Sequence, residues 1–291
     1  MTAIEHFAGV NVENVSSLSR ALDPRYPSNR LAIAGALIVG VAAALANLFG
    51  LDIGLEPISA AVGLFLAWAI ARELDPDHPA SAAVAMPASL VLLLAIGPAS
   101  LVVSMGILLG VRLVAGTVGA PLRTLDIIGV VGLAAFLGTN PIGVVGLGVV
   151  GLGVVVDEPR RNRAVLITAT AVSAFVAVVL VSGLERTWTT PDTAGWIALA
   201  VAVAAAVSVI PAASPTSSTD RHTGRVLRTR VTTARVAAGS AVVAGFVLAG
   251  GVGIAALAGT AAAALTGTGI RRIGAGLSST ATRSTDETED E

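Results

Sequence analysis

Long apolar stretches alternate with short polar segments along almost the whole of this 291-residue chain. A helix needs about 20 mostly apolar residues to cross a bilayer, or about 17 at the shortest. Charged residues, glycine or proline separate the successive stretches. The stretches cover residues 31–49, 57–71, 80–96, 99–116, 125–138, 141–156, 164–184, 193–210, 236–250 and 252–270. The pattern predicts an all-α, polytopic transmembrane helix bundle of about ten helices, and hydropathy alone allows eight to ten.

The fifth and sixth stretches, residues 125–138 and 141–156, are the weakest part of this prediction. Stretches of 14 to 16 residues rise only about 21–24 Å at 1.5 Å per residue, which is less than a hydrocarbon core of about 30 Å. Thr139 and Asn140 separate them. They are interpreted either as two full crossings or as a re-entrant hairpin.

The placement of arginine provides an independent test, because cytoplasmic loops carry an excess of positive charge. The chain has no lysine, so all 18 basic residues are arginine. With residues 1–30 inside and ten crossings, every arginine except Arg186 falls on the cytoplasmic side. Merging the fifth and sixth stretches would move the cluster at 160–163 outside. The charge pattern therefore favours ten helices with both termini in the cytoplasm, and the location predicted is the plasma membrane.

Five segments follow from this topology. Residues 1–30 lack the apolar run of a signal peptide and form a cytoplasmic N-terminal arm. Residues 31–210 form an eight-helix membrane body, and residues 211–235 form a flexible basic cytoplasmic loop. Residues 236–270 form a C-terminal hairpin of two helices with a turn at Gly250 and Gly251. The acidic tail, residues 271–291, is predicted to be disordered.

Composition narrows the classes of function. Only 13% of residues are charged, against about 25% in soluble domains. There is no cysteine, which excludes disulfides, thiolate metal sites and cysteine nucleophiles. A net charge of −1 indicates no nucleic-acid partner. Membrane lipids are the expected partners, together with a membrane protein partner in one interpretation below. Arginine in place of lysine, with an acidic tail, is typical of proteins from a salt-rich cytoplasm.

The densest polar motif lies in the loop between the second and third helices, residues 72–79, RELDPDHP. Asp75 and Asp77 beside His78 have the spacing to hold a divalent metal or, through one, a phosphate. The alternative is structural, because acids before a helix cap its N-terminus and interact favourably with its dipole. We expect no cofactor, and metal binding is the less favoured interpretation.

A second polar set belongs to the same side of the predicted bundle. Arg112 lies near the end of the fourth helix, where an arginine can reach the interface or pair with an acid from another loop. If the loops converge, one cytoplasmic cluster results. Its members are Arg72, Glu73, Asp75, Asp77, Arg112, Arg123, Asp126 and Asp157. The alternative interpretation is that these residues only anchor helix ends and set the topology.

The predicted spans have no ionisable residue near their midpoints, although ion-coupled transporters usually place one there. Pro87 lies inside the third helix and would kink it. Serines such as Ser89 and Ser104 are expected to bond to the backbone of their own helix or to a neighbour. The glycine pattern GVVGLGVVGLG at 143–153 resembles a dinucleotide fingerprint, but helix packing explains it better inside an apolar span.

Three functions fit these observations. The favoured one is a permease-like or channel-like protein for a small neutral or lipidic solute. The second is a membrane enzyme that acts on a phosphorylated lipid at the cytoplasmic face. In that enzyme Asp75 and Asp77, with His78 beside them, hold a metal, while Arg72 and Arg112 bind phosphate. The third is a non-catalytic scaffold or accessory subunit.

Overall fold

The computed structural model describes residues 16, 18, 22–51, 53–118, 122–138, 142–156, 188–210, 214–219 and 224–274. These residues form helices and no strand, apart from two isolated bridges. The helices are α3 (Pro27–Leu48), α4 (Pro57–Leu74), α5 (Pro79–Ile96), α6 (Leu101–Ala115), α7 (Thr124–Leu137), α8 (Gly143–Val156), α10 (Thr193–Val209), α11 (Arg228–Ala249) and α12 (Gly251–Leu257), with the π-helical turn η2 (Ala258–Ala262). The predicted all-α class is confirmed for this part of the chain. The predicted helix at 164–184 and the tail from residue 275 lie outside the described residues.

Proline and glycine mark the helix boundaries. Pro27, Pro57 and Pro79 begin α3, α4 and α5, where the missing N–H costs nothing because it has no partner in the first turn. Gly116 ends α6 in the left-handed conformation, with φ 63°. Gly250, with φ 59°, joins α11 to α12. The turn predicted at Gly250 and Gly251 is confirmed.

Five of the described helices are long and apolar enough to cross a membrane. They are Pro27–Leu48, Pro57–Leu74, Pro79–Ile96, Arg228–Ala249 and Gly251–Gly274, the last of which contains α12 and η2. Four further apolar helices are shorter: α6, α7, α8 and α10. This architecture is compatible with an integral membrane protein.

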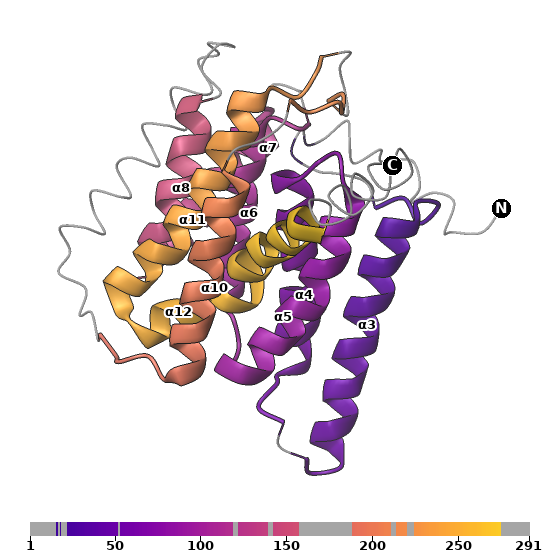
Figure 1. Cartoon of the computed structure of the whole chain (residues 1–291), viewed down its shortest axis with the longest axis vertical. Helices are drawn as coiled ribbons and strands as arrows, with labels where there is room; N and C mark the ends of the chain where they lie inside the picture. The colour runs from indigo at the N-terminus through magenta and orange to yellow at the C-terminus, as the bar shows by residue number, and fades with distance from the viewer. Residues whose placement is uncertain are drawn as a thin grey trace, which may run out of the picture.

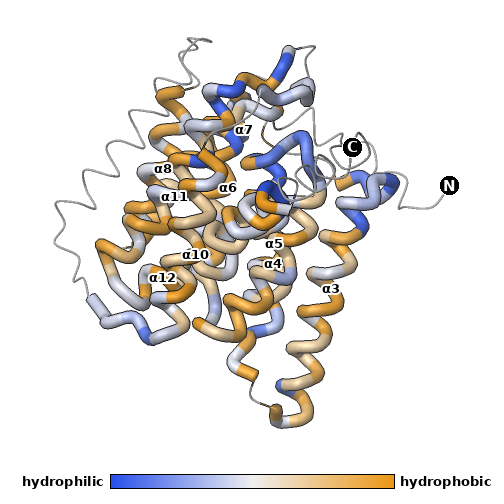
Figure 2. Tube along the Cα trace, in the orientation of Figure 1, coloured by the Kyte–Doolittle hydropathy of each residue, from blue (hydrophilic) through white to orange (hydrophobic). Residues whose placement is uncertain are grey.

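The outer surface of the bundle is apolar. Only 11% of the most apolar window of α3 is buried, and the side chains of Ile38 and Leu48 are 68% and 76% exposed. Figure 1 shows α3 at the edge of the bundle, and Figure 2 shows hydrophobic residues along its length. A helix that is apolar on its exposed face is unfavourable in water and favourable in lipid.

The span Gly251–Gly274 lies inside the bundle, and 83% of its most apolar 18-residue window is buried. It packs against α4, α5, α10 and α11. Its π-helical turn meets two serines from neighbouring helices. The Ser89 hydroxyl donates to the carbonyl of Gly259, and the hydroxyls of Ser104 and Thr260 lie 2.7 Å apart. Of the two alternatives predicted for these serines, both take the second, because each bonds to a neighbouring element and not to its own helix backbone.

Glycine brings α6 and α8 into close contact. A Cβ atom added at Gly110 would lie 2.5 Å from the backbone carbon of Val149, and one at Gly106 would lie 3.3 Å from the Cα of Gly146. Small residues let two helix backbones approach in this way. The glycine pattern at 143–153 thus serves helix packing, as predicted.

Candidate functional site

Polar side chains gather at one end of the bundle, which we call the arginine end. Here α4, α6 and α10 end, and α5, α7 and α11 begin. In Figure 2, hydrophilic segments are concentrated in the upper part of the view, where α7 lies and α11 begins. Arg230 illustrates the arrangement, because its guanidinium donates to the carbonyls of Val114 and Leu113 at the end of α6, both at 2.9 Å. The start of α11 and the end of α6, which border two loops predicted on the same side, therefore lie in contact.

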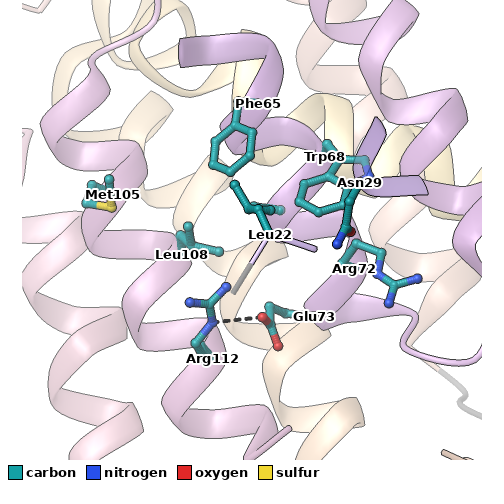
Figure 3. A pocket seen from close by; sticks show the side chains of 10 residues that line it. Leu22, Asn29, Phe65, Trp68, Arg72, Glu73, Met105, Leu108 and Arg112 are labelled. Atoms are coloured by element: carbon teal, nitrogen blue, oxygen red, sulfur yellow. Dashed lines mark hydrogen bonds and ion pairs between the residues drawn. The ribbon is translucent and has the colours of Figure 1, made fainter. Parts of the chain in front are cut away.

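A cavity of about 240 Å³ opens at this end between α4, α6 and the start of α3. The α4 residues that line it follow Phe65 by three, four, seven and eight positions. This is the spacing of residues on one face of a helix. Its α6 residues have the same kind of spacing. The lining consists of Leu22, Asn29, Phe65, Trp68, Ala69, Arg72, Glu73, Met105, Leu108 and Arg112. Figure 3 shows the apolar side chains at one part of the cavity and the charged ones at the other.

Glu73 and Arg112 form the charged part of the cavity. Glu73 is fully buried, and its Oε1 accepts from the Nε of Arg112 at 2.8 Å. Its Oε2 accepts from the hydroxyl of Thr117. A buried carboxylate requires such partners, because an uncompensated charge in a low dielectric is costly. The pair therefore joins α4 to α6.

Leu18, one of the few described residues before α3, lies against the same pair. Nη1 of Arg112 donates to the carbonyl of Leu18 at 2.8 Å. The amide of Leu18 and the hydroxyl of Ser16 donate to Asp126, which is the third residue of α7. Asp126 also accepts from the backbone amide of Arg123 at 2.8 Å and thus satisfies one of the free amides at that helix start.

Asp75 is the centre of a separate network. It is 3% exposed, and Oδ1 lies 3.1 Å from His78 Nδ1 and 3.4 Å from Arg235 Nη2. Ser81 donates to Oδ2, and Arg271 Nε lies 2.9 Å from that oxygen. The Arg271 contact is an ion pair and not an aligned hydrogen bond.

Arg235 connects this network to two helix ends. Its Nε donates to the carbonyl of Leu74 at 2.7 Å, and its Nη1 donates to the carbonyl of Val209 at 2.8 Å. Arg272 donates to the carbonyl of Ser208 in the last turn of α10. Cations are favourable at helix C-termini, where carbonyls lack partners. The arginines thus tie the ends of α4 and α10 to α11 and the C-terminal helix.

Asp77 holds a third segment. It accepts from the amides of Thr216 and Ser217, each at 2.9 Å, and from the Ser217 hydroxyl. Partial burial acts to raise the pKa of Asp77, but the hydrogen bonds from Ser217 and Thr216 outweigh it and lower that pKa below its ordinary value. The carboxylate is therefore ionised at neutral pH.

The predicted site residues fall into distinct groups. Arg72, Glu73 and Arg112 line the cavity together. Asp75 and His78 belong to the arginine network, Asp77 holds residues 216–217, and Asp126 accepts from Ser16 and Leu18. Asp157 lies outside the described residues. Within the described part of the chain, no group of three or more side chains is placed to hold a metal ion.

Sequence reasoning missed Arg235 and Arg271 as partners of Asp75. For Arg235 the reason is the start of α11, which lies at Arg228 and not at residue 236 as predicted, so that Arg235 is inside the helix and 3% exposed. Arg271 was missed because the last helix continues to Gly274 and does not end at residue 270 as predicted. The sequence does carry a helical period here, because Val231, Ala234 and Ala238 are spaced three and four residues apart. In the structure all three are buried on one face of α11.

No family model, no curated protein and no solved structure matches this chain. Its function is therefore inferred from the geometry of the arginine end.

Proposed function

We propose that the chain is a multi-pass plasma-membrane protein with ten crossings and both termini in the cytoplasm. We propose further that it acts as a permease-like protein for a small neutral or lipidic solute. The observation that carries this proposal is the cavity at the arginine end. One part of it is apolar, with Phe65, Trp68 and Leu108, and another part holds Asn29 and charged groups.

The properties of the cavity support a lipidic solute over a strongly polar one. Ligand sites typically combine an apolar lining with a few polar groups that fix orientation. A volume of about 240 Å³ is too small for a whole lipid, but it accommodates a headgroup and the first carbons of a chain. The remaining chain would lie along the apolar outer surface of the bundle. Trp68 donates to Ser28 at 3.2 Å, which fixes the indole beside the cavity.

Lipid transfer between leaflets tests this function directly. The purified chain is reconstituted into phosphatidylcholine vesicles that contain a trace of a nitrobenzoxadiazole-labelled single-chain lipid. Dithionite then measures how fast the label crosses the bilayer. We expect faster crossing than in protein-free vesicles. Equal rates in the two preparations would contradict the proposal.

A cavity-filling variant links the transfer to the site. Leu108→Phe adds volume at a cavity residue that is 6% exposed, and we expect a several-fold lower transfer rate. Leu125→Phe is the matched control, because Leu125 is 50% exposed on α7 and does not line the cavity. Equal transfer rates for the two variants would show that lipid transfer does not use this cavity.

One observation favours the second candidate, a membrane enzyme for a phosphorylated lipid. Arg72 and Arg112, its predicted phosphate ligands, line the cavity together. Its predicted metal ligands, Asp75 and Asp77, have different partners in separate networks. Replacing both aspartates with alanine should abolish turnover of a phosphorylated lipid if they are catalytic. Retained turnover in a folded double variant would refute this enzyme.

A further inference from the structure

Two arginines lie on successive carbonyls at the end of α10. Nη1 of Arg235, from α11, donates to the carbonyl of Val209 at 2.8 Å. Nη1 of Arg272, from the last helix, donates to the carbonyl of Ser208 at 3.0 Å. Carbonyls at a helix C-terminus attract cations but carry only partial negative charge. The two guanidiniums are therefore held close together without being neutralised there.

A third guanidinium, that of Arg271, joins them through Asp75. Nε of Arg271 lies 2.9 Å from Oδ2 of Asp75, and Nη2 of Arg235 lies 3.4 Å from Oδ1. In the described part of the chain, Asp75 is the only carboxylate that forms an ion pair with either arginine, and Arg272 has no such pair. Even with Asp77 counted, the three arginines exceed these carboxylates by one. Arg235, Arg271 and Arg272, which we call the arginine cluster, thus keep a net positive charge.

Several donors of the arginine cluster have no acceptor. Arg271 contacts Asp75 through Nε, and that contact is not an aligned hydrogen bond. Arg272 donates through Nη1. Among the residues that the structure describes, no acceptor meets the Nη groups of Arg271 or the Nε and Nη2 of Arg272, and these atoms are accessible from outside. They can bind an oxyanion, which guanidinium groups contact through paired, charge-assisted hydrogen bonds.

Exposed apolar side chains lie beside the arginine cluster. Val207 on α10 is 64% exposed, and Ile270 and Ile273 on the last helix are 52% and 60% exposed. The two helices are in close contact here, because a Cβ atom added at Gly269 would lie 3.2 Å from the Cβ of Ala205. Net positive charge at the end of two helices, next to an apolar outer surface, complements the headgroup and chains of an anionic lipid.

We propose that the arginine cluster binds the phosphate of an anionic phospholipid, whose chains lie along the apolar surface of α10 and the last helix. Phosphate oxygens accept from Arg271 and Arg272, while Arg235 remains on its two carbonyls and adds positive charge. A zwitterionic lipid offers the same phosphate, but the cluster repels its cationic group. The site lies apart from the cavity between α4, α6 and the start of α3. The anionic lipid is therefore a bound partner of the protein and not its transported solute.

Native mass spectrometry of the full chain in detergent tests this site, because it resolves each bound lipid by mass. The probes are dioleoyl phosphatidylglycerol and dioleoyl phosphatidylcholine, which have the same chains. Glycerophosphoglycerol, the headgroup without chains, is the competitor. An arginine near an anionic headgroup contributes about fivefold in affinity. We expect phosphatidylglycerol to bind at least about fivefold more tightly than phosphatidylcholine, and an equal concentration of glycerophosphoglycerol should not displace it.

Two variants test the arginines that bind the phosphate. Arg272→Gln removes the charge and keeps an amide that can donate to the Ser208 carbonyl. Arg271→Gln leaves Asp75 paired with Arg235. Each should reduce the preference for phosphatidylglycerol several-fold, with the unfolding midpoint measured without lipid to verify the fold. Arg228→Gln is the matched control, because it removes one positive charge from an exposed residue at the same end, and it should not change the preference.

Three results would overturn the proposal. Equal affinities for the two lipids would refute the preference for negative charge. An equal loss of preference in Arg228→Gln and Arg272→Gln, or no loss in either Arg271→Gln or Arg272→Gln, would show that the basic surface attracts lipid without this site. Displacement by glycerophosphoglycerol at equal concentration would identify a site for free phosphate and refute the lipid. The proposed transfer of a solute through the cavity stands or falls separately, because its residues are not part of this site.

Discussion

Arg112 on α6 and Glu73 on α4 form an ion pair at 2.8 Å at the base of the cavity, and Glu73 is fully buried. The same guanidinium reaches the carbonyl of Leu18. One arginine thus connects two helices and the segment that precedes the first described helix. The position of the pair has a consequence for stability as well as for binding.

Loss of Arg112 should destabilise the protein more than loss of the whole pair. Arg112→Gln leaves the Glu73 carboxylate buried without its cation, which costs about 3–5 kcal/mol. The double variant with Glu73→Gln should recover most of that loss. Thermal unfolding in detergent, followed by tryptophan fluorescence, measures both midpoints. A double variant as unstable as Arg112→Gln would show that the charge pair is not the cause.

Close packing of α6 on α8 should not tolerate a side chain at Gly110. In Gly110→Ala the new Cβ lies 2.5 Å from the backbone of Val149, so the helices must separate, at a cost of about 1–3 kcal/mol. Gly132→Ala on α7 is the control, because nothing lies within 4 Å of its added Cβ. It should be neutral or slightly stabilising, since alanine favours helix by about 0.5–1 kcal/mol. Equal unfolding midpoints for the two variants would argue against tight packing here.

The proposed topology can be tested with single cysteines, since the chain contains none. Ser218→Cys and Thr190→Cys introduce thiols at exposed positions that the topology places on opposite sides. In intact cells a membrane-impermeant maleimide should label Cys at 190 and should label Cys at 218 only after lysis. The reverse pattern would invert the orientation. Labelling of both in intact cells would exclude an odd number of crossings between them.

The contact of Asp77 with residues 216–217 should persist well into the acidic range. Its pKa is lowered from an ordinary value of 3.8, so the contact adds stability above that value. The added stability is lost only as the pH falls through the lowered pKa. At neutral pH, Asp77→Asn weakens the acceptor for the two amides, and trypsin should cleave faster after Arg225 and Arg228. An unchanged cleavage rate would show that Asp77 does not restrain this segment.

Much of the fold is predictable because bilayer thickness and arginine placement both constrain it. The ends of α4 and α6 fall on the same side of the predicted bundle, so Glu73 and Arg112 could be assigned to one cluster before their contact was seen. The sequence does not predict that this cluster splits into separate networks around Glu73, Asp75 and Asp77, because loop order does not determine which arginine reaches which acid. Asp75 demonstrates this point, since Arg235 and Arg271 come from distant helices.

The start of α11 shows a second limit of sequence reasoning. Residues 228–235, RTRVTTAR, are too polar for an apolar window, yet they are helical. Their arginines bind the carbonyl ends of α4, α6 and α10. Such residues are stabilised by partners from elsewhere in the chain, which local hydropathy does not record.

The inner position of Gly251–Gly274 also bears on how the protein is made. This span follows its neighbours α4, α5, α10 and α11 in the chain, so it is synthesised after them. In the proposed membrane topology, the inner faces of those helices would be covered by lipid or by the insertion machinery until the last helix displaces that cover. The bundle would then be completed from its outside inward, and a chain interrupted near Gly250 would lack the helix that fills its core.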